Sequence, residues 1–208
     1  MGVKVEKTVS DIRETIIKKA RTAGASEKED LARSFDYMLL EALIETDKFS
    51  MIVMGRPDSL GCYCPVNDLL RSGIETLAEN FDVTLIDGEA GLEQISRQVM
   101  RSVDTPVIVS DISMRGFQTA ALIKDAIESQ KAIDYKKIGL VLNRVRGDLA
   151  VFQEHIDKTG LELFGYIPED DLVTSFDMQA KPLIELPDDT PAYNSAVQIL
   201  SRIGMESI

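Results

Sequence analysis

Residues 51–65 have the sequence Met51-Ile-Val-Met-Gly-Arg-Pro-Asp-Ser-Leu-Gly-Cys-Tyr-Cys-Pro65. The apolar residues at the start of this stretch are typical of a buried strand, which we expect over residues 47–55. The Gly, Pro, Asp and Ser residues that follow indicate a loop, and a helix is expected after it over residues 67–80. The stretch therefore predicts a strand–loop–helix unit of the kind from which α/β domains are built.

The same alternation continues along the rest of the chain. Further strands are expected at residues 83–86, 105–110, 137–143 and 161–166, and helices at residues 8–21, 31–45, 92–102, 117–129, 148–159 and 191–203. Strands that alternate with helices predict an α/β fold with a mostly parallel sheet. The sequence contains no internal repeat, linker or low-complexity segment, so we expect a single domain over residues 1–208.

The composition limits the partners of the protein. The chain has 208 residues, of which 44% are hydrophobic and 28% charged, and its formal net charge is −12. A surface of this charge repels phosphate backbones, so we expect no nucleic-acid partner. The sequence has no run of about 18 apolar residues and no signal-peptide core near its start, so we expect no membrane partner and a cytoplasmic location.

Cys62 and Cys64 are the only cysteines in the chain. One residue separates them, so in an extended backbone both side chains point the same way, whereas a disulfide across so small a ring would be strained. Two thiolates supply half of a tetrahedral sulfur site, and a second copy of the chain would supply the other half across a two-fold axis. The alternative is that both cysteines are buried as small hydrophobic residues, but the neighbouring Gly and Pro favour the metal site.

Asp87 follows the apolar run Val83–Ile86. Ligands of open parallel sheets bind at the carboxyl ends of strands, and a carboxylate there can hold Mg²⁺ directly or through water. Gly88 and Gly91 would make the following loop mobile, as a nucleotide-sensing switch requires. The alternative is that Asp87 caps the next helix.

Two other features of the sequence are expected to lie on the protein surface. His155, the only histidine, lies among charged residues of the helix expected over residues 148–159, and we interpret it as a surface residue rather than a ligand. Pro182 and Pro187 bracket residues 179–187, which are expected to form a surface loop, with a place beside a nucleotide as the alternative.

In these motifs the chain resembles the CooC-type accessory ATPases that help to insert nickel into carbon monoxide dehydrogenase. These proteins belong to the MinD/ParA/nitrogenase-iron-protein class of P-loop proteins. The resemblance covers essentially the whole chain, and its most specific marks are Met54-Gly-Arg-Pro57 with Gly61-Cys-Tyr-Cys64, and Leu85-Ile-Asp-Gly-Glu-Ala-Gly-Leu-Glu93. It implies a three-layer α/β fold of the deviant-Walker-A class of P-loop NTPases, with a mostly parallel sheet.

The resemblance also implies a nucleotide site for ATP or ADP with Mg²⁺. Asp87 would act near the Mg²⁺ and the attacking water, and Gly88, Glu89 and Gly91 would belong to the switch loop. In this loop Gly88 stands where the family has Asn, and Gln94-Ile95 stand where a His-Leu pair is usual. The segments that line the adenine in this class are matched by Asn143 with Arg144 and by Pro168 with Glu169.

The resemblance implies a metal site and two protein partners. Cys62 and Cys64 would bind Ni²⁺ or Zn²⁺ between the two subunits of a homodimer, and the client would be carbon monoxide dehydrogenase. ATP would close the dimer, and hydrolysis would open it and release the metal.

One part of the family pattern is absent from the sequence. The family begins with a strand, a Gly-rich Walker A loop and a helix, but neither G-x-x-x-x-G-K-[ST] nor G-K-G-G-x-G-K-T occurs in the 208 residues. Without those amides and that lysine nothing in the sequence cradles the phosphates, so we expect negligible ATP hydrolysis by this chain alone. We interpret the chain as truncated at its N-terminus relative to the family, with the first strand–loop–helix unit absent.

Two other functions stay open. The first is a nucleotide-independent metal-binding or scaffold protein that uses Cys62 and Cys64. The second is an iron–sulfur electron carrier related to the nitrogenase iron protein, whose cluster cysteines lie far apart in sequence, unlike the C-x-C motif here.

Overall fold

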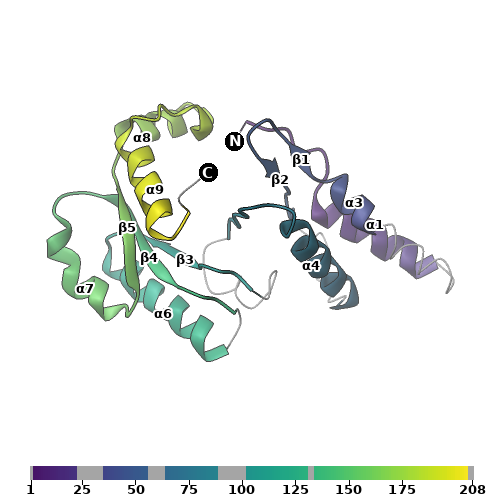
Figure 1. The fold of residues 1–208 in the computed structure, drawn as a ribbon, viewed down its shortest axis with the longest axis horizontal. Coiled ribbons are helices and arrows are strands. Elements are labelled where there is room, and N and C mark those ends of the chain that lie inside the picture. The colour runs from purple at the N-terminus through teal and green to yellow at the C-terminus, as the bar shows by residue number, and fades with distance from the viewer. Residues whose placement is uncertain (1, 23–34, 56–63, 89–101, 131–133, 206–208) are drawn as a thin grey trace. The chain divides into compact units, whose positions relative to one another are not determined.

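The computed structural model describes residues 2–22, 35–55, 64–88, 102–130 and 134–205 (Figure 1). The chain divides into two compact units, residues 88–208 with residues 1–2, and residues 3–87. The single domain expected over residues 1–208 stays a prediction. Of the helices in the described ranges, none is long and apolar enough to cross a membrane.

The larger unit is built on a parallel sheet. Its strands are β3 (Val107–Ser110), β4 (Gly139–Val145) and β5 (Glu162–Pro168), and they lie side by side in that order. The predicted α/β fold with a mostly parallel sheet is confirmed. The strands begin within two residues of the predicted starts.

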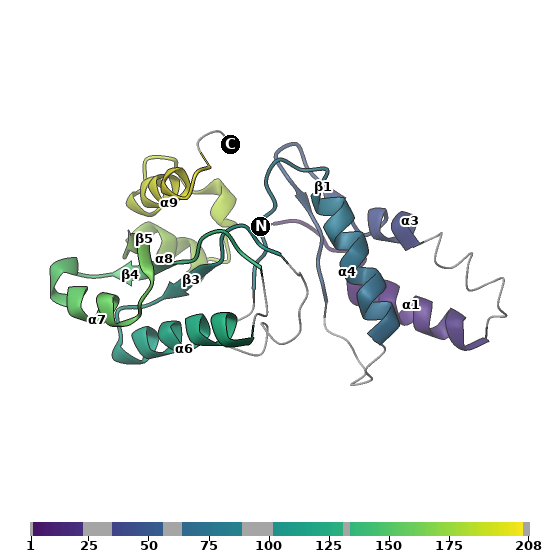
Figure 2. The same cartoon turned by 60° about the horizontal axis from the view of Figure 1, so that its bottom comes forward.

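Helices cover both faces of this sheet (Figure 2). Leu140 and Leu142 of β4 point to one face, where they pack against α6 (Met114–Gln130) and α7 (Gln153–Lys158). Val141 points to the other face and packs with Phe164 against Ile199 of α9 (Pro191–Arg202). A strand that is covered on both faces needs an unbroken apolar run, which explains the sequence of β4.

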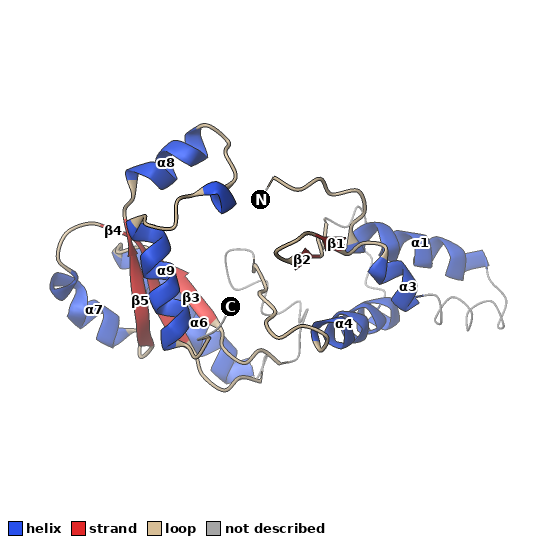
Figure 3. Cartoon of the chain, turned by 45° about the horizontal axis from the view of Figure 1, so that its top comes forward, coloured by secondary structure: helices blue, strands red, loops and turns tan. Residues whose placement is uncertain are grey.

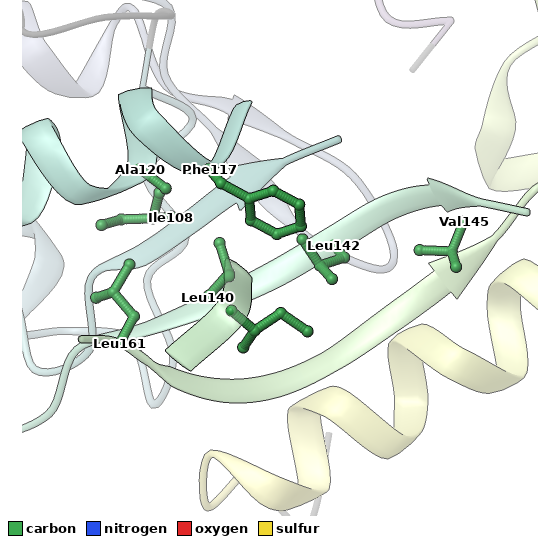
Figure 4. Close-up of a cluster of buried hydrophobic side chains, with 8 residues drawn as sticks. Ile108, Phe117, Ala120, Leu140, Leu142, Val145 and Leu161 are labelled. Carbon is green, nitrogen blue, oxygen red and sulfur yellow. The ribbon is translucent and has the colours of Figure 1, made fainter. Parts of the chain in front are cut away.

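The core between β4 and α6 is well packed (Figure 4). Figure 4 shows Leu140 and Leu142 pointing toward Phe117 and Ala120 of α6, with Ile108 of β3 beside them. Each fully buried side chain of this size stabilises the fold by about 1.5–3 kcal/mol. The sheet is therefore firmly fixed where β4 approaches its carboxyl end.

The end of the chain contains more helix than the sequence predicts. The helix expected over residues 148–159 is a 3₁₀ turn, η1 (Leu149–Phe152), followed by α7, and the turn begins at Asp148, whose carboxylate accepts from the amide of Ala150. The sequence does not predict α8 (Asp171–Met178), and η2 (Leu183–Glu185) lies within the expected loop 179–187. These elements are short, so their apolar residues give little periodic signal.

The smaller unit packs α1 (Val9–Thr22) against α3 (Phe35–Leu40), and it also contains α4 (Cys64–Ala78). Val9, Ile12 and Ile16 of α1 form a buried cluster with Met38 and Leu39 of α3. The helices expected over residues 8–21 and 67–80 are confirmed, with α4 starting earlier than predicted.

Two predictions fail between α3 and α4. The helix expected over residues 31–45 ends at Leu40, and the strand expected over residues 47–55 is only β2 (Ser50–Met51), which pairs antiparallel with β1 (Ile44–Glu45) (Figure 3). The last residues of the expected helix belong instead to β1, and the amide and hydroxyl of Thr46 both donate to the carbonyl of Phe49 and close the tight turn between β1 and β2. The second prediction fails because the carbonyls of Val53 and Met54 accept the first amides of α1, from Val9 and Ser10, instead of a neighbouring strand.

The buried strand expected over residues 83–86 is also wrong. These residues have no regular structure, and the side chain of Leu85 is 76% exposed. A strand needs a hydrogen-bonded neighbour, and no strand of the described residues pairs with this segment. An apolar run alone predicts the side chains of a strand but not its partner.

Candidate functional site

Four predicted site residues lie together at the carboxyl edge of the sheet. Asn143 and Arg144 lie near the end of β4, Pro168 ends β5, and Glu169 follows it. Val145 pairs directly with Pro168, and the amide of Glu169 donates to the carbonyl of Val145 at 3.1 Å. The structure therefore brings together the two segments that the sequence analysis assigned to the adenine.

A β-bulge shapes this edge. Leu142 pairs with Tyr166 and Val145 pairs with Pro168, so β4 advances three positions while β5 advances two. The extra residue lies at Asn143–Arg144, and Arg144 has a φ of 56°, in the left-handed region. That conformation costs roughly 1–2 kcal/mol for a residue other than glycine. Such strain persists only where the surroundings hold it, and it is common at binding sites.

The side chain of Asn143 helps to hold the bulge. Its Oδ1 accepts a hydrogen bond of 2.9 Å from the amide of Arg144. Asn143 is half-buried, whereas the side chain of Arg144 is exposed. A carboxamide that both donates and accepts, beside a planar guanidinium that can stack, suits a flat heterocycle such as a nucleobase.

Glu169 is engaged by a residue that the sequence does not predict for the site. The guanidinium of Arg146 donates from Nε and Nη2 to the two carboxylate oxygens of Glu169. This hydrogen bonding lowers the pKa of Glu169, against an opposing effect of burial, and the positive charges of Arg146 and Arg144 lower it further. The hydrogen bond to Glu169 raises the pKa of Arg146. The only indication of this ion pair in the sequence is that a basic residue, Arg146, and an acidic residue, Glu169, directly follow two neighbouring strands.

Asp170 connects the edge to two helices. Its Oδ1 accepts from the amides of Leu172 and Val173 at the start of α8, at 2.9 and 3.4 Å. Its Oδ2 accepts from the amide of Ala192 in the first turn of α9, at 3.1 Å. Asp170 is a further residue that the sequence analysis missed, and it holds the starts of α8 and α9 beside the site.

An open cavity of about 680 Å³ lies at the carboxyl end of β3. Its polar lining includes Ser110, Asp111, Ser113 and Arg115, and its apolar lining includes Ile108. The Oδ1 of Asp111 accepts from the hydroxyl and amide of Ser113, which lowers the pKa of Asp111. Because Ser110 pairs with Leu142, the cavity and the Asn143 bulge lie at the same edge of the sheet.

Of the other predicted site residues, the structure describes Asp87, Gly88 and Cys64. Asp87 is exposed and follows the irregular segment 83–86 of the smaller unit, and Gly88 is exposed as the first residue of this part of the larger unit. Cys62, Glu89 and Gly91 lie outside the described residues. Cys64 is the first residue of α4.

No cluster of metal-binding side chains is found in the described ranges. No group of three or more His, Cys, Asp or Glu side chains there could hold a metal ion. His155 is half-buried rather than a surface residue, because its ring stacks on Phe117 with the centroids 5.8 Å apart.

The chain has relatives among known proteins. No family model matches the chain. The chain is 36% identical over 210 residues to the uncharacterized ATP-binding protein MJ0685 of Methanocaldococcus jannaschii, a match that covers 98% of the chain and 80% of that protein. It is 28% identical over 151 residues to the carbon monoxide dehydrogenase accessory protein CooC of Rhodospirillum rubrum, covering 71% of the chain and 54% of CooC.

Two solved structures have a similar fold. The cell division ATPase MinD of Pyrococcus furiosus matches 98% of the chain and 78% of its own, with a TM-score of 0.64 and 18% identity. A ParA family ATPase of Chlorobium tepidum matches 99% of the chain and 78% of its own, with a TM-score of 0.66 and 15% identity. At such identities the likeness concerns the fold alone, and it agrees with the predicted P-loop NTPase-like architecture.

Proposed function

This chain belongs to the MinD/ParA-type family of P-loop ATPases, and we propose that within this family it is a CooC-type accessory protein for nickel insertion into carbon monoxide dehydrogenase. The observation that carries the proposal is the match to CooC, which extends over 71% of the chain at 28% identity. CooC is named as an accessory protein of carbon monoxide dehydrogenase. The C-x-C motif of this chain offers two sulfur donors, which are soft ligands suited to a nickel ion.

The proposed nucleotide is ATP or ADP with Mg²⁺, since MJ0685 is named as an ATP-binding protein. Asn143, Arg144 and Pro168 would contact the adenine, because a carboxamide and a guanidinium follow one another at that edge, beside the end of β5. Asp87 would bind near the Mg²⁺, and its exposed carboxylate is an oxygen ligand of the kind that Mg²⁺ prefers. Gly88, Glu89 and Gly91 would form the switch loop. The bound nucleotide supplies the phosphate chemistry, and these residues bind and orient it.

The proposed cargo site is formed by two copies of the chain. Cys62 and Cys64 of each copy would bind one Ni²⁺ or Zn²⁺ at a two-fold axis. Cys64 begins α4, so the motif lies directly at the start of a helix. The client would be carbon monoxide dehydrogenase, to which the metal passes when the dimer opens.

We also propose that the phosphate loop comes from polypeptide outside these 208 residues. In the described part of the sheet β3 pairs only with β4. A further strand beside β3 would cover this edge, as unpaired edges normally are.

A metal titration of the 208-residue chain tests the proposal. We expect about one Ni²⁺ or Zn²⁺ per two chains, with a dimer formed only when metal is present. The Cys62→Ala/Cys64→Ala double variant should lose both the metal and the dimer, while the control His155→Gln should keep both. Equal metal binding by the cysteine variant would overturn the proposed site.

The second candidate is a metal-binding protein that does not use nucleotide. The absence of a Walker A motif from the 208 residues favours it. Adding ADP with Mg²⁺ to the same samples separates the two, because only the first candidate predicts nucleotide binding.

A further inference from the structure

The strained bulge at Asn143–Arg144 is held from two sides. On its own side, the amide of Arg144 is bonded to the side chain of Asn143. On the other side, Val145 is buried in the core, and its carbonyl accepts from the amide of Glu169. The bulge is thus fixed between a buried residue and the start of the loop after β5.

Glu169 is itself held by Arg146. Both carboxylate oxygens of Glu169 accept from the guanidinium of Arg146, one residue beyond Val145. The ion pair and the backbone bond from Glu169 to Val145 therefore tie the ends of β4 and β5 together twice. A carboxylate that is engaged at both oxygens is poorly placed to bind a base directly.

The position of Arg146 indicates a local role. Its side chain is 75% exposed, and exposed ion pairs contribute little to folding stability. The fork geometry of an Arg–carboxylate pair does, however, fix the relative position of the two segments that carry it. Arg146 and Glu169 thus constrain the shape of the edge more than the stability of the fold.

We propose that Arg146 is a positioning residue that, through its ion pair with Glu169, holds the Asn143–Arg144 bulge in the shape that receives a nucleobase. This inference rests on the proposed nucleotide site at this edge. It assigns Glu169 an indirect role and adds Arg146 to the site.

Two measurements on the isotope-labelled 208-residue chain test the proposal. The first is the position of the Asn143, Arg144 and Val145 amide signals in the NMR spectrum without ligand, and the second is the affinity for ADP. The variants are Arg146→Met, Glu169→Gln and the conservative Arg146→Lys. The control is Lys158→Met, which removes the exposed ion pair of Lys158 with Glu154 on α7, 2.7 Å in length.

We expect Arg146→Met and Glu169→Gln to move the three amide signals and to weaken ADP binding about five- to ten-fold, with an unchanged melting temperature. Arg146→Lys should lie between these variants and the wild type, and the control should match the wild type. Unmoved amide signals in the first two variants would overturn the proposal, as would moved signals with unchanged ADP affinity.

The same measurements distinguish a failure of the Arg146 proposal from a failure of the proposed nucleotide site. If the wild-type chain does not bind ADP at all, the nucleotide site is wrong, and with it the role of Arg146 toward a base. The amide signals then still decide whether Arg146 holds the bulge.

Discussion

Two apolar runs that look alike in sequence have opposite fates in the structure. Ile138–Leu142 is followed by Asn143, and Val83–Ile86 is followed by Asp87, so both have the form of a buried strand that ends in a polar site residue. The first is largely β4, with neighbours on both sides and helices on both faces. The second is irregular and exposed. The difference teaches that pairing partners, rather than apolar residues, make a strand.

The largest expected effect comes from truncating one leucine in each run. Leu142 is fully buried, so Leu142→Ala should destabilise the fold by about 2–5 kcal/mol. Leu85 is largely exposed, so Leu85→Ala should change the free energy of unfolding by less than about 0.5 kcal/mol. Urea denaturation of both variants measures the difference. An equal loss in the two would mean that residues 83–86 form a buried strand after all.

A smaller effect is expected from two glycines. A Cβ on Gly139, at the start of β4, would meet the ring of Phe164, whereas a Cβ on Gly88 would meet nothing within 4 Å. Gly139→Ala should therefore destabilise the fold by about 1–3 kcal/mol through overpacking. Gly88→Ala should leave the stability unchanged or raise it by about 0.5 kcal/mol.

Thermal unfolding of the two glycine variants provides the comparison. A melting temperature of Gly139→Ala equal to that of the wild type would show that Phe164 can move aside. The packing around β4 would then be looser than its burial implies.

The sequence predicts the fold well where an apolar run also has a neighbouring strand to pair with. The alternation in residues 105–166 is enough to predict β3, β4 and β5 and the helices between them, because every strand there lies next to the following one. It is not enough for residues 41–55, where the turn at Thr46 and the bonds from α1 to Val53 and Met54 decide the structure. Those interactions depend on hydrogen bonds of single polar groups, and the spacing of apolar residues in the sequence does not predict them.

The candidate site is predictable only in part for a similar reason. Asn143, Arg144, Pro168 and Glu169 follow from the family resemblance, and the parallel order of β4 and β5 brings them together. The roles of Arg146 and Asp170 come from hydrogen bonds between residues that lie far apart in sequence, 23 and 22 positions respectively. The left-handed backbone at Arg144 has no signal in the sequence, because glycine would be the expected residue there.

The measurement that tests the account most directly is an ADP titration of the 208-residue chain, followed residue by residue in the NMR spectrum. We expect binding at about millimolar concentration, since the phosphate loop is absent from the sequence, with the signals of Asn143, Arg144 and Glu169 moving together. Unchanged signals at these residues, or changes confined to other parts of the chain, would contradict a nucleotide site at the carboxyl edge of β4 and β5.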